Sequence, residues 1–191
     1  MKYDGRTLEP TDIEGDLVCL RPVGLSMANE FLAACLESKS ALVPFMPWDC
    51  WTSAETLAFL EEANAARAGG TRFEFAVIRK GDGRFLGMMA LNICDPFTPV
   101  GEIGYWVRSS ETGQGVAQDA LRGMVDACQR AGKFARLSAW VSSTNLASRG
   151  VLSACGFIEG RHQPLGQCCH GKWHDMIHYV RPLCDAPTRP S

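Results

Sequence analysis

The chain has 191 residues, of which 46% are apolar and 21% charged, and its formal net charge is −2. These values are those of ordinary globular proteins and exclude a largely disordered chain, while the scattered basic residues lack the electrostatic footprint of a nucleic-acid binder. No apolar run approaches the roughly 18 residues of a membrane span, and nine cysteines without an export signal favour reduced thiols over disulfides. We therefore expect a cytoplasmic protein that binds neither nucleic acid nor membrane.

Hydrophobic periodicity and turn residues predict a series of strands and helices. Ser26 is a candidate N-cap for the first helix, Pro44 prevents that helix from continuing, and Ser53 offers the second helix only a weak cap. In chain order, the sequence predicts a strand at 16–23, helices at 26–39 and 52–70, strands at 72–79, 85–94 and 101–108, a helix at 117–131, a strand at 134–142, a short helix at 144–157 and a final strand at 172–183.

The order of these elements predicts one mixed α/β layer structure. Residues 117–128 carry an apolar face at helical spacing, and Gly132 ends that helix. Since this helix joins the strand at 101–108 to the strand at 134–142, we expect a crossover with those two strands parallel. A single domain over residues 1–191 is expected, with a core at about 16–183 and flexible termini.

The segment GYWVRSSETGQGVAQDAL, residues 104–121, ends a strand, exposes glycine backbone and begins a helix within a few residues. A helix N-terminus leaves backbone N–H groups unpaired and carries partial positive charge. Gly113 and Gly115 lack the Cβ atoms that would keep a phosphate away from those N–H groups. The turn therefore predicts an anion-binding site.

Four interpretations of this turn compete. A P-loop needs Gly-Lys-Ser/Thr, but Val116 and Ala117 follow Gly115. A dinucleotide fingerprint needs a third small residue at Gln118 and an acidic residue about 20 residues later, and neither is found. An ordinary glycine-rich turn before a helix is the third interpretation. The fourth is the pyrophosphate turn of an acetyltransferase family, whose pattern is Gln/Arg-x-x-Gly-x-Gly/Ala.

Two motifs together resemble the GNAT N-acetyltransferases. Residues 112–117 are similar to the pyrophosphate turn, and residues 144–157 resemble the second signature of the family, with Asn145, Ser148, Gly156 and Phe157 in place. Residues 42–48, together with Asp175 and Tyr179, resemble the RimJ/RimL branch of ribosomal-protein acetyltransferases. The resemblance covers residues 17–183. It implies the acyl-CoA N-acyltransferase fold, a central mixed sheet of six to seven strands flanked by helices, with two splayed parallel strands forming the CoA cleft.

The resemblance implies acetyl-CoA as the co-substrate. Thr112 stands where the family usually has Arg or Gln, so we expect either weaker cofactor binding or a compensating charge from Arg108 or Arg149. The Val107 N–H is expected to polarise the thioester carbonyl. The implied cofactor-binding residues are Trp106, Val107, Arg108, Thr112, Gly113, Gln114, Gly115, Val116, Ala117 and Asn145.

The implied reaction is direct attack of an amine on the thioester. Glu102 is the candidate base, with a solvated carboxylate at a strand end as the alternative. Ser148 is the candidate group near the sulfur, with a capping hydroxyl as the alternative. Trp48, Glu102 and His174 are the candidate acceptor contacts. Tyr179 is interpreted as a core tyrosine rather than an acid.

The RimJ/RimL resemblance implies a peptide or protein N-terminal α-amine as acceptor. A small-molecule amine, and a CoA-binding module without turnover, are the alternatives. Dimers are common in the family, so a homodimer is a further implication. His162, Cys168, Cys169, His170 and His174 match no standard zinc spacing. We therefore expect no metal, and expect these residues in a loop and hairpin over the acceptor cleft.

Overall fold

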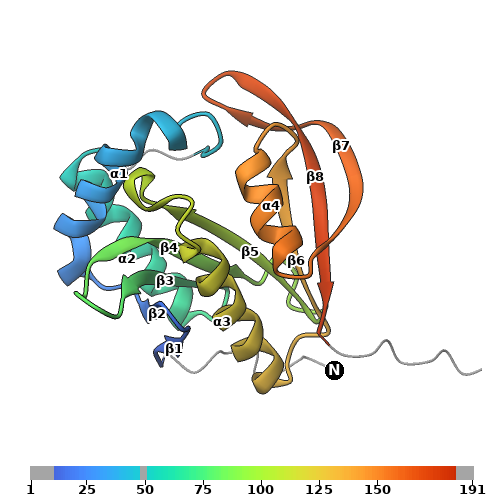
Figure 1. The fold of residues 1–191 in the computed structure, drawn as a ribbon, viewed down its shortest axis with the longest axis horizontal. Helices are drawn as coiled ribbons and strands as arrows, with labels where there is room; N and C mark the ends of the chain where they lie inside the picture. The colour runs from blue at the N-terminus through green and yellow to red at the C-terminus, as the bar shows by residue number, and fades with distance from the viewer. Residues whose placement is uncertain (1–10, 48–50, 184–191) are drawn as a thin grey trace, which may run out of the picture.

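The structure is a computed structural model that describes residues 11–47 and 51–183. These residues form one mixed sheet with helices on both faces (Figure 1). No helix within them combines the length and apolar character needed to cross a bilayer. In chain order the elements are β1 (Ile13–Glu14), β2 (Val18–Pro22), the 3₁₀ turn η1 (Leu25–Met27), α1 (Ala28–Leu42), α2 (Ser53–Ala68), β3 (Arg72–Arg79), β4 (Phe85–Asn92), β5 (Val100–Val107), the 3₁₀ turn η2 (Ser109–Glu111), α3 (Val116–Ala131), β6 (Arg136–Ser142), α4 (Leu146–Ala154), β7 (Ile158–Cys169) and β8 (Lys172–Pro182).

The eight strands of the described chain lie in the order β1-β2-β3-β4-β5-β6-β8-β7. β5 and β6 are parallel, as the crossover predicted, and the remaining neighbours are antiparallel. The predicted mixed α/β fold is confirmed, but the sheet has eight strands rather than six to seven. Sequence analysis missed the two-residue β1 and the twelve-residue β7. β7 exposes most of its side chains, so it lacks the apolar alternation that marks a strand.

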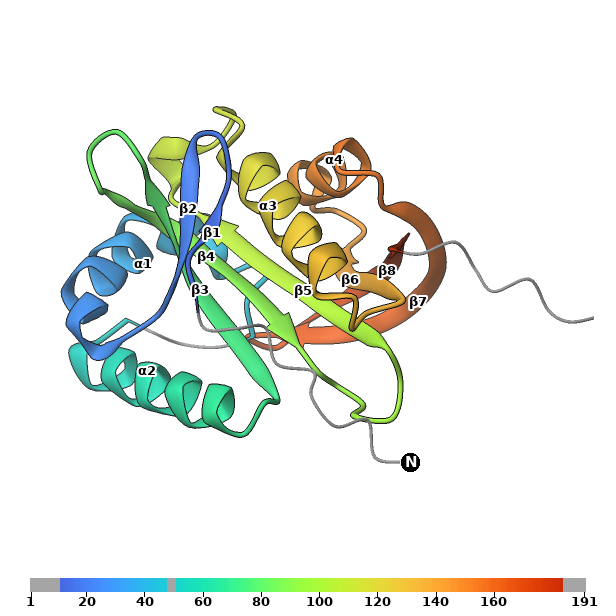
Figure 2. The same cartoon turned by 90° about the horizontal axis from the view of Figure 1, so that it is seen from below.

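The helices divide into two pairs, with α1 and α2 on one face of the sheet and α3 and α4 on the other (Figures 1 and 2). Successive side chains of a strand point to opposite faces, so each strand feeds two cores. Phe31 of α1 packs edge-on against Phe85 and Trp106, with ring centroids 5.9 and 5.8 Å away. On the other face, Leu121 and Met124 of α3 are fully buried. The sheet is therefore the shared wall of two apolar layers.

The N-termini of α1 and α2 differ from the two predicted N-caps. Ser26 does not cap α1, because the turn η1 precedes the helix and Met27 is its N-cap. The N-cap of α2 is Thr52 rather than Ser53: the Thr52 side chain accepts from the Glu55 N–H, and the Glu55 carboxylate accepts from the Thr52 N–H. This reciprocal pair is a capping box. α1 ends at Leu42, before Pro44, as predicted.

A buried carboxylate fastens the first hairpin to α3. Asp119 accepts backbone N–H groups from three successive residues, Asp16, Leu17 and Val18, at 2.9, 2.8 and 2.9 Å. A Cβ at Gly15 would collide with this carboxylate, so glycine is needed there. The contact ties the β1–β2 turn to the helix that begins at the glycine turn.

We expect Asp119→Ala to lower the free energy of unfolding by about 2–4 kcal/mol, because three charge-assisted hydrogen bonds lose their acceptor. Urea denaturation followed by circular dichroism measures the change. Asp126→Ala is the matched control, since Asp126 lies on the exposed face of the same helix, and we expect it to stay within about 0.5 kcal/mol. Equal stability of the two variants would contradict a fastening role for Asp119.

Candidate active site

The parallel strands β5 and β6 pair over only three residues. Val100, Gly101 and Glu102 pair with Arg136, Leu137 and Ser138, and no pairing between the two strands follows Glu102 in the described chain. β4 occupies the outer edge of β5, and β8 the outer edge of β6. The inner edges beyond Glu102 therefore present backbone groups that no strand satisfies. The predicted splayed parallel strands are confirmed.

Two cavities meet at this divergence. The glycine-turn cavity, about 360 Å³, is lined by Gly113, Gly115 and the first residues of α3. The strand-face cavity, about 390 Å³, lies on the side of the sheet that α1 and α2 cover. They share the lining residues Phe45, Met46, Tyr105, Trp106, Asn145 and Ser148. A ligand held at the glycine turn can therefore present its far end to the strand-face cavity.

The glycine turn has the geometry of an anion site. Gly113 and Gly115 have φ of 75° and 80°, a region that favours glycine. No side chain caps α3, and the first helical hydrogen bond runs from the Asp119 N–H to the Gly115 carbonyl at 2.9 Å. The N–H groups of residues 116–118 thus have no partner within the helix. They lie at the positive end of the helix dipole, where a phosphate is favoured.

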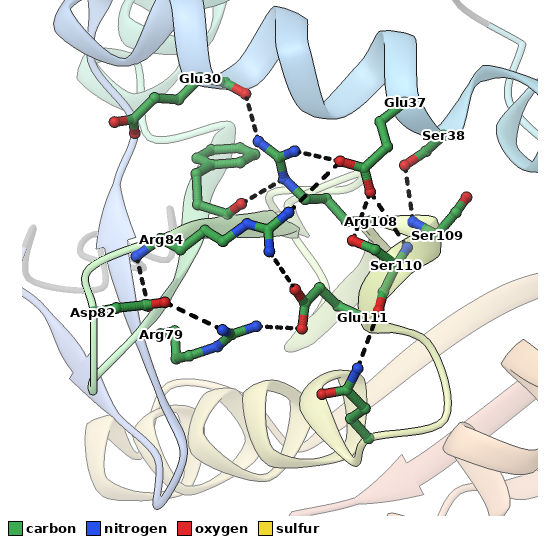
Figure 3. Close-up of polar contacts among 12 residues, drawn as sticks. Glu30, Glu37, Ser38, Arg79, Asp82, Arg84, Arg108, Ser109, Ser110 and Glu111 are labelled. Atoms are coloured by element: carbon green, nitrogen blue, oxygen red, sulfur yellow. Dashed lines mark hydrogen bonds and ion pairs between the residues drawn. The ribbon is translucent and has the colours of Figure 1, made fainter.

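A network of charged side chains holds this turn from behind (Figure 3). The buried Glu111 carboxylate accepts from Arg79 and, at 2.9 Å, from Arg84. Glu37 of α1 accepts from Arg108 at 2.6 Å and from the Ser110 hydroxyl at 2.7 Å. The residues just before the turn are therefore fixed to the β3–β4 hairpin and to α1.

Thr112 and Gln114 brace the turn with their side chains. The Thr112 hydroxyl donates to the Ser109 carbonyl at 2.9 Å, and the Gln114 amide donates to the Ser110 carbonyl at 3.0 Å. Both bonds hold these side chains against the backbone of the turn, and Thr112 lines the glycine-turn cavity. In this arrangement the turn offers backbone N–H groups, rather than side-chain charge, to an anion.

Arg108 and Arg149, the two candidates for the charge that Thr112 lacks, both bond to groups of the protein. Arg108 is buried and donates to the Phe85 carbonyl, to Glu37 and to the Glu30 carbonyl. Arg149 donates to Tyr179, Glu159 and the Ser143 carbonyl. Neither belongs to the described lining of the two cavities. Compensation by either arginine therefore stays a prediction.

The alternation of backbone groups along a strand shows which edge of β5 its last N–H and carbonyl groups face. The Arg108 N–H donates to the Leu86 carbonyl at 2.7 Å, so it faces β4. A Cβ at Gly87 would collide with the Trp106 carbonyl, which therefore also faces β4. Because successive backbone groups of a strand point to opposite edges, the Val107 N–H faces the divergence. This is consistent with the predicted role of the Val107 N–H, whereas the Trp106 carbonyl and the Arg108 N–H face β4.

Glu102 stands at the last paired position before the strands diverge, and its side chain lines the strand-face cavity. Burial raises the pKa of the Glu102 carboxyl, and a hydrogen bond with Cys94 partly opposes that rise. A carboxylate with a raised pKa in a partly dry cavity can accept a proton from an amine. The geometry is therefore consistent with the predicted base.

A hydroxyl pair lies where the two cavities meet. The Ser148 Oγ is 2.9 Å from the Tyr105 Oη, and the Tyr105 hydroxyl is also 3.0 Å from the Ser148 carbonyl oxygen. Asn145 caps α4 by accepting the Ser148 N–H at 3.1 Å. Burial raises the pKa of Tyr105, so its hydroxyl stays protonated near neutrality. Tyr105 was missed in the sequence, although it lies in the GYW segment that precedes the turn.

The other predicted acceptor contacts and the histidines of the C-terminal hairpin lie in different places. Trp48 lies outside the described residues. His174 is buried, with its Nδ1 3.2 Å from the Ser142 Oγ and its ring 6.1 Å from Phe45, but it is not in the described lining of either cavity. His170 lies at the tip of the β7–β8 hairpin, and its Nε2 is 3.1 Å from the Met46 carbonyl. The expected hairpin over the cleft is thus present.

The remaining candidates have structural partners. Tyr179 is buried and donates to Glu159 at 2.7 Å, as expected of a core tyrosine rather than an acid. His162 is 3.0 Å from Glu159. Within the described chain, no three His, Cys, Asp or Glu side chains are arranged to hold a metal ion.

Sequence analysis also missed Glu74, a buried carboxylate of β3 that lines the strand-face cavity. Burial raises the pKa of Glu74 to about 7, against opposing contributions from Arg72 and Arg67. A signal for it was available: Glu74 shares the strand parity of Ala76 and Ile78, which face α1 and α2. A charged residue at such a position is buried, and this one opens into a cavity.

The sequence and the fold were also compared with those of known proteins. A family model described as an acetyltransferase (GNAT) domain matches residues 18–158. The probable N-acetyltransferase YjcK of Bacillus subtilis is 24% identical over 167 residues, covering 85% of this chain and 92% of that protein. RimJ of Mycobacterium smegmatis, in complex with CoA-disulfide, is 27% identical with a TM-score of 0.84, covering 92% and 88%. RimL, a ribosomal L7/L12 α-N-protein acetyltransferase in complex with coenzyme A, is 20% identical with a TM-score of 0.84, covering 90% and 98%.

We expect Glu111→Gln to weaken CoA binding about tenfold, because two guanidinium groups lose their buried counter-charge and the turn loses its anchor. Isothermal titration with CoA measures the dissociation constant. Asp82→Asn is the matched control, since Asp82 also contacts Arg79 but is exposed, and we expect no more than a twofold change. Unchanged CoA binding in Glu111→Gln would show that the turn holds its shape without the network.

Proposed function

This chain belongs to the GNAT acetyltransferase family and is an acetyl-CoA-dependent acetyltransferase, and we propose that it acetylates the α-amino group at the N-terminus of a peptide or protein. The observation that carries this proposal is the meeting of two unlike cavities at the β5–β6 divergence. One offers bare backbone N–H groups to a diphosphate, and the other offers carboxylates to an amine. RimL, named for α-N-acetylation of a ribosomal protein, has the same fold.

The residues of the glycine turn fit coenzyme A. In the proposed complex, the N–H groups of residues 113–117 receive the diphosphate. The open inner edge of β5, with the Val107 N–H, pairs with the amide-bearing arm as a further strand would. Acetyl-CoA supplies the activated thioester. We also infer that residues 1–191 act as one domain, since the eight described strands share one sheet.

Three groups of this chain divide the proton chemistry in our proposal. Glu102 accepts the proton that the ammonium form of the acceptor must lose. The Val107 N–H donates to the carbonyl oxygen as negative charge develops there. The hydroxyl pair of Tyr105 and Ser148 lies where the cavities meet. It donates a proton to the departing thiolate and regains one from the attacking nitrogen, which loses its second proton as the amide forms.

A thiol-release assay with acetyl-CoA tests the proposed acceptor class. The panel holds peptides with free N-termini, the same peptides with acetylated N-termini, polyamines and amino sugars. We expect CoA release above the acceptor-free rate with free peptides, and mass spectrometry to place the acetyl group on the α-amine. Turnover confined to the small amines would reject the protein-acceptor proposal, and tight CoA binding without any turnover would identify a binding module.

We expect Glu102→Gln to lower kcat about 100-fold or more while leaving the CoA dissociation constant unchanged, because general base catalysis contributes roughly 10²–10⁴-fold. Burial raises the Glu102 pKa above its usual 4.5. Since the ionised form is the base, kcat should fall as pH falls through that raised pKa, and this limb should vanish in the variant. Stopped assays from pH 5 to 9 measure the profile.

Glu61→Gln is the control, because Glu61 is an exposed carboxylate on α2. Equal losses of kcat and CoA affinity in Glu102→Gln would contradict its assignment as base, since a residue that only shapes the site affects both.

A further inference from the structure

Glu74 is a charged residue in the middle of β3, at a position where its neighbours on the same face are apolar. Its residue exposure is 7%, and Ala76 and Ile78, which share its face, pack under α1 and α2. Acidic residues are rarely buried unless they are paired and hydrogen-bonded. The position of Glu74 therefore needs an explanation beyond the packing of the sheet.

The partners of Glu74 within the described chain satisfy its charge only in part. The Arg72 Nε lies 3.4 Å from the Glu74 carboxylate, yet neither the Nε nor the Nη2 of Arg72 makes a hydrogen bond there. Arg72 also reaches Glu62 of α2, whose side chain is 69% exposed. No hydrogen bond to the Glu74 carboxylate is found among the described residues, and Glu74 lines the strand-face cavity.

The space between Glu74 and the divergence of β5 and β6 is open. Glu74 pairs with Ala90 of β4, and Ala90 pairs with Gly104 of β5. These are the two smallest residues, and a Cβ added at Gly104 would meet nothing nearer than the Ala90 Cβ at 3.9 Å. All three residues line the strand-face cavity. Two strand spacings, about 10 Å, separate the Glu74 and Gly104 backbones, so an acceptor amine bound at Glu74 must move across this gap to reach the divergence.

Two carboxylates, Glu74 and Glu102, and one guanidinium, Arg72, line the strand-face cavity, so the charged side chains of its described lining are net negative when both carboxylates are ionised. Burial raises its pKa to about 7, Arg72 and Arg67 lower it, and Glu62 raises it. Glu102 lines the same cavity from β5. A bound ammonium group would favour the ionised carboxylate, so the binding of a cation and the ionisation of Glu74 reinforce each other in the neutral range.

We propose that Glu74 is a second carboxylate of the acceptor site, which binds the ammonium form of the acceptor before Glu102 removes its proton. This inference rests on the proposed function, because it takes the strand-face cavity as the acceptor site. The roles are separate: Glu74 sets the affinity for the charged amine, whereas Glu102 sets the rate of proton removal. Glu74 is thus a specificity-determining residue that favours cationic acceptors over neutral ones.

The test measures acceptor binding without turnover, in the presence of CoA rather than acetyl-CoA. Calorimetry gives the dissociation constants of trialanine amide and of its N-acetylated form, which lacks the ammonium charge. At pH 8 we expect Glu74→Gln to weaken binding of the free peptide about 10- to 100-fold, the value of a charged hydrogen bond. Binding of the acetylated peptide and of CoA should not change. At pH 6, where wild-type Glu74 is mostly protonated, the effect on the free peptide should shrink.

Two further variants test whether the effect of Glu74→Gln arises in the strand-face cavity. Glu62→Gln removes the exposed partner of Arg72 outside the cavity, and we expect both peptides to bind within twofold of wild type. Ala90→Val fills the space between Glu74 and the divergence, and we expect it to weaken the free peptide while CoA still binds.

Three results would overturn the inference. The first is that the free peptide does not bind to the wild type. The second is that its dissociation constant at pH 8 is unchanged in Glu74→Gln. The third is that Glu74→Gln weakens the binding of both peptides equally at either pH. The proposed function fails separately: a Glu74-dependent preference for the free peptide without thiol release from acetyl-CoA would reject turnover and leave the inference standing.

Discussion

The site depends on the separation of β5 and β6 after three paired residues. Each strand keeps a partner on its outer edge, so the sheet remains continuous on both sides while its middle opens. Unpaired backbone groups are costly inside a protein and attract another chain when they lie at an edge. Here they line two connected cavities instead. A ligand that carries amide groups can replace the missing strand, which links the opening of the sheet to the binding of coenzyme A.

The glycine turn shows how a site made of backbone is kept in place. Side chains in front of the α3 N-terminus would block an anion, so the turn must be fixed from behind. Glu111 and Glu37 do this by holding Arg79, Arg84 and Arg108, which anchors the turn to the β3–β4 hairpin and to α1 (Figure 3). The guanidinium groups near the turn therefore stabilise its shape. In the proposed complex, binding of the diphosphate is left to backbone N–H groups and the helix dipole.

Local patterns were enough to predict much of the fold and of the cofactor turn. The crossover, the strands predicted at 72–79, 85–94 and 101–108, and the turn at Gly113 and Gly115 follow from periodicity and turn chemistry over short windows. What the sequence did not show depends on contacts distant in sequence. Arg108 shares a strand face with Trp106, and only the position of α1 over that face shows that its guanidinium donates to Glu37. β7 was missed because its partner β8, rather than its own alternation, makes it a strand.

In the proposed reaction, the strand-face cavity must satisfy two opposed requirements. An amine reaches the enzyme at neutral pH as an ammonium ion, which a carboxylate binds well, yet attack on a thioester requires the neutral amine. A carboxylate that binds the cation tightly also raises the pKa of that cation, and so opposes its deprotonation. Two carboxylates at different distances from the divergence resolve this conflict. Glu74, two strands away, can attract the charged group, and Glu102, at the last paired residue, can take the proton where the amine meets the thioester. Arg72 beside Glu74 limits the negative charge of the cavity, so the cost of burying the first carboxylate is reduced before any acceptor binds.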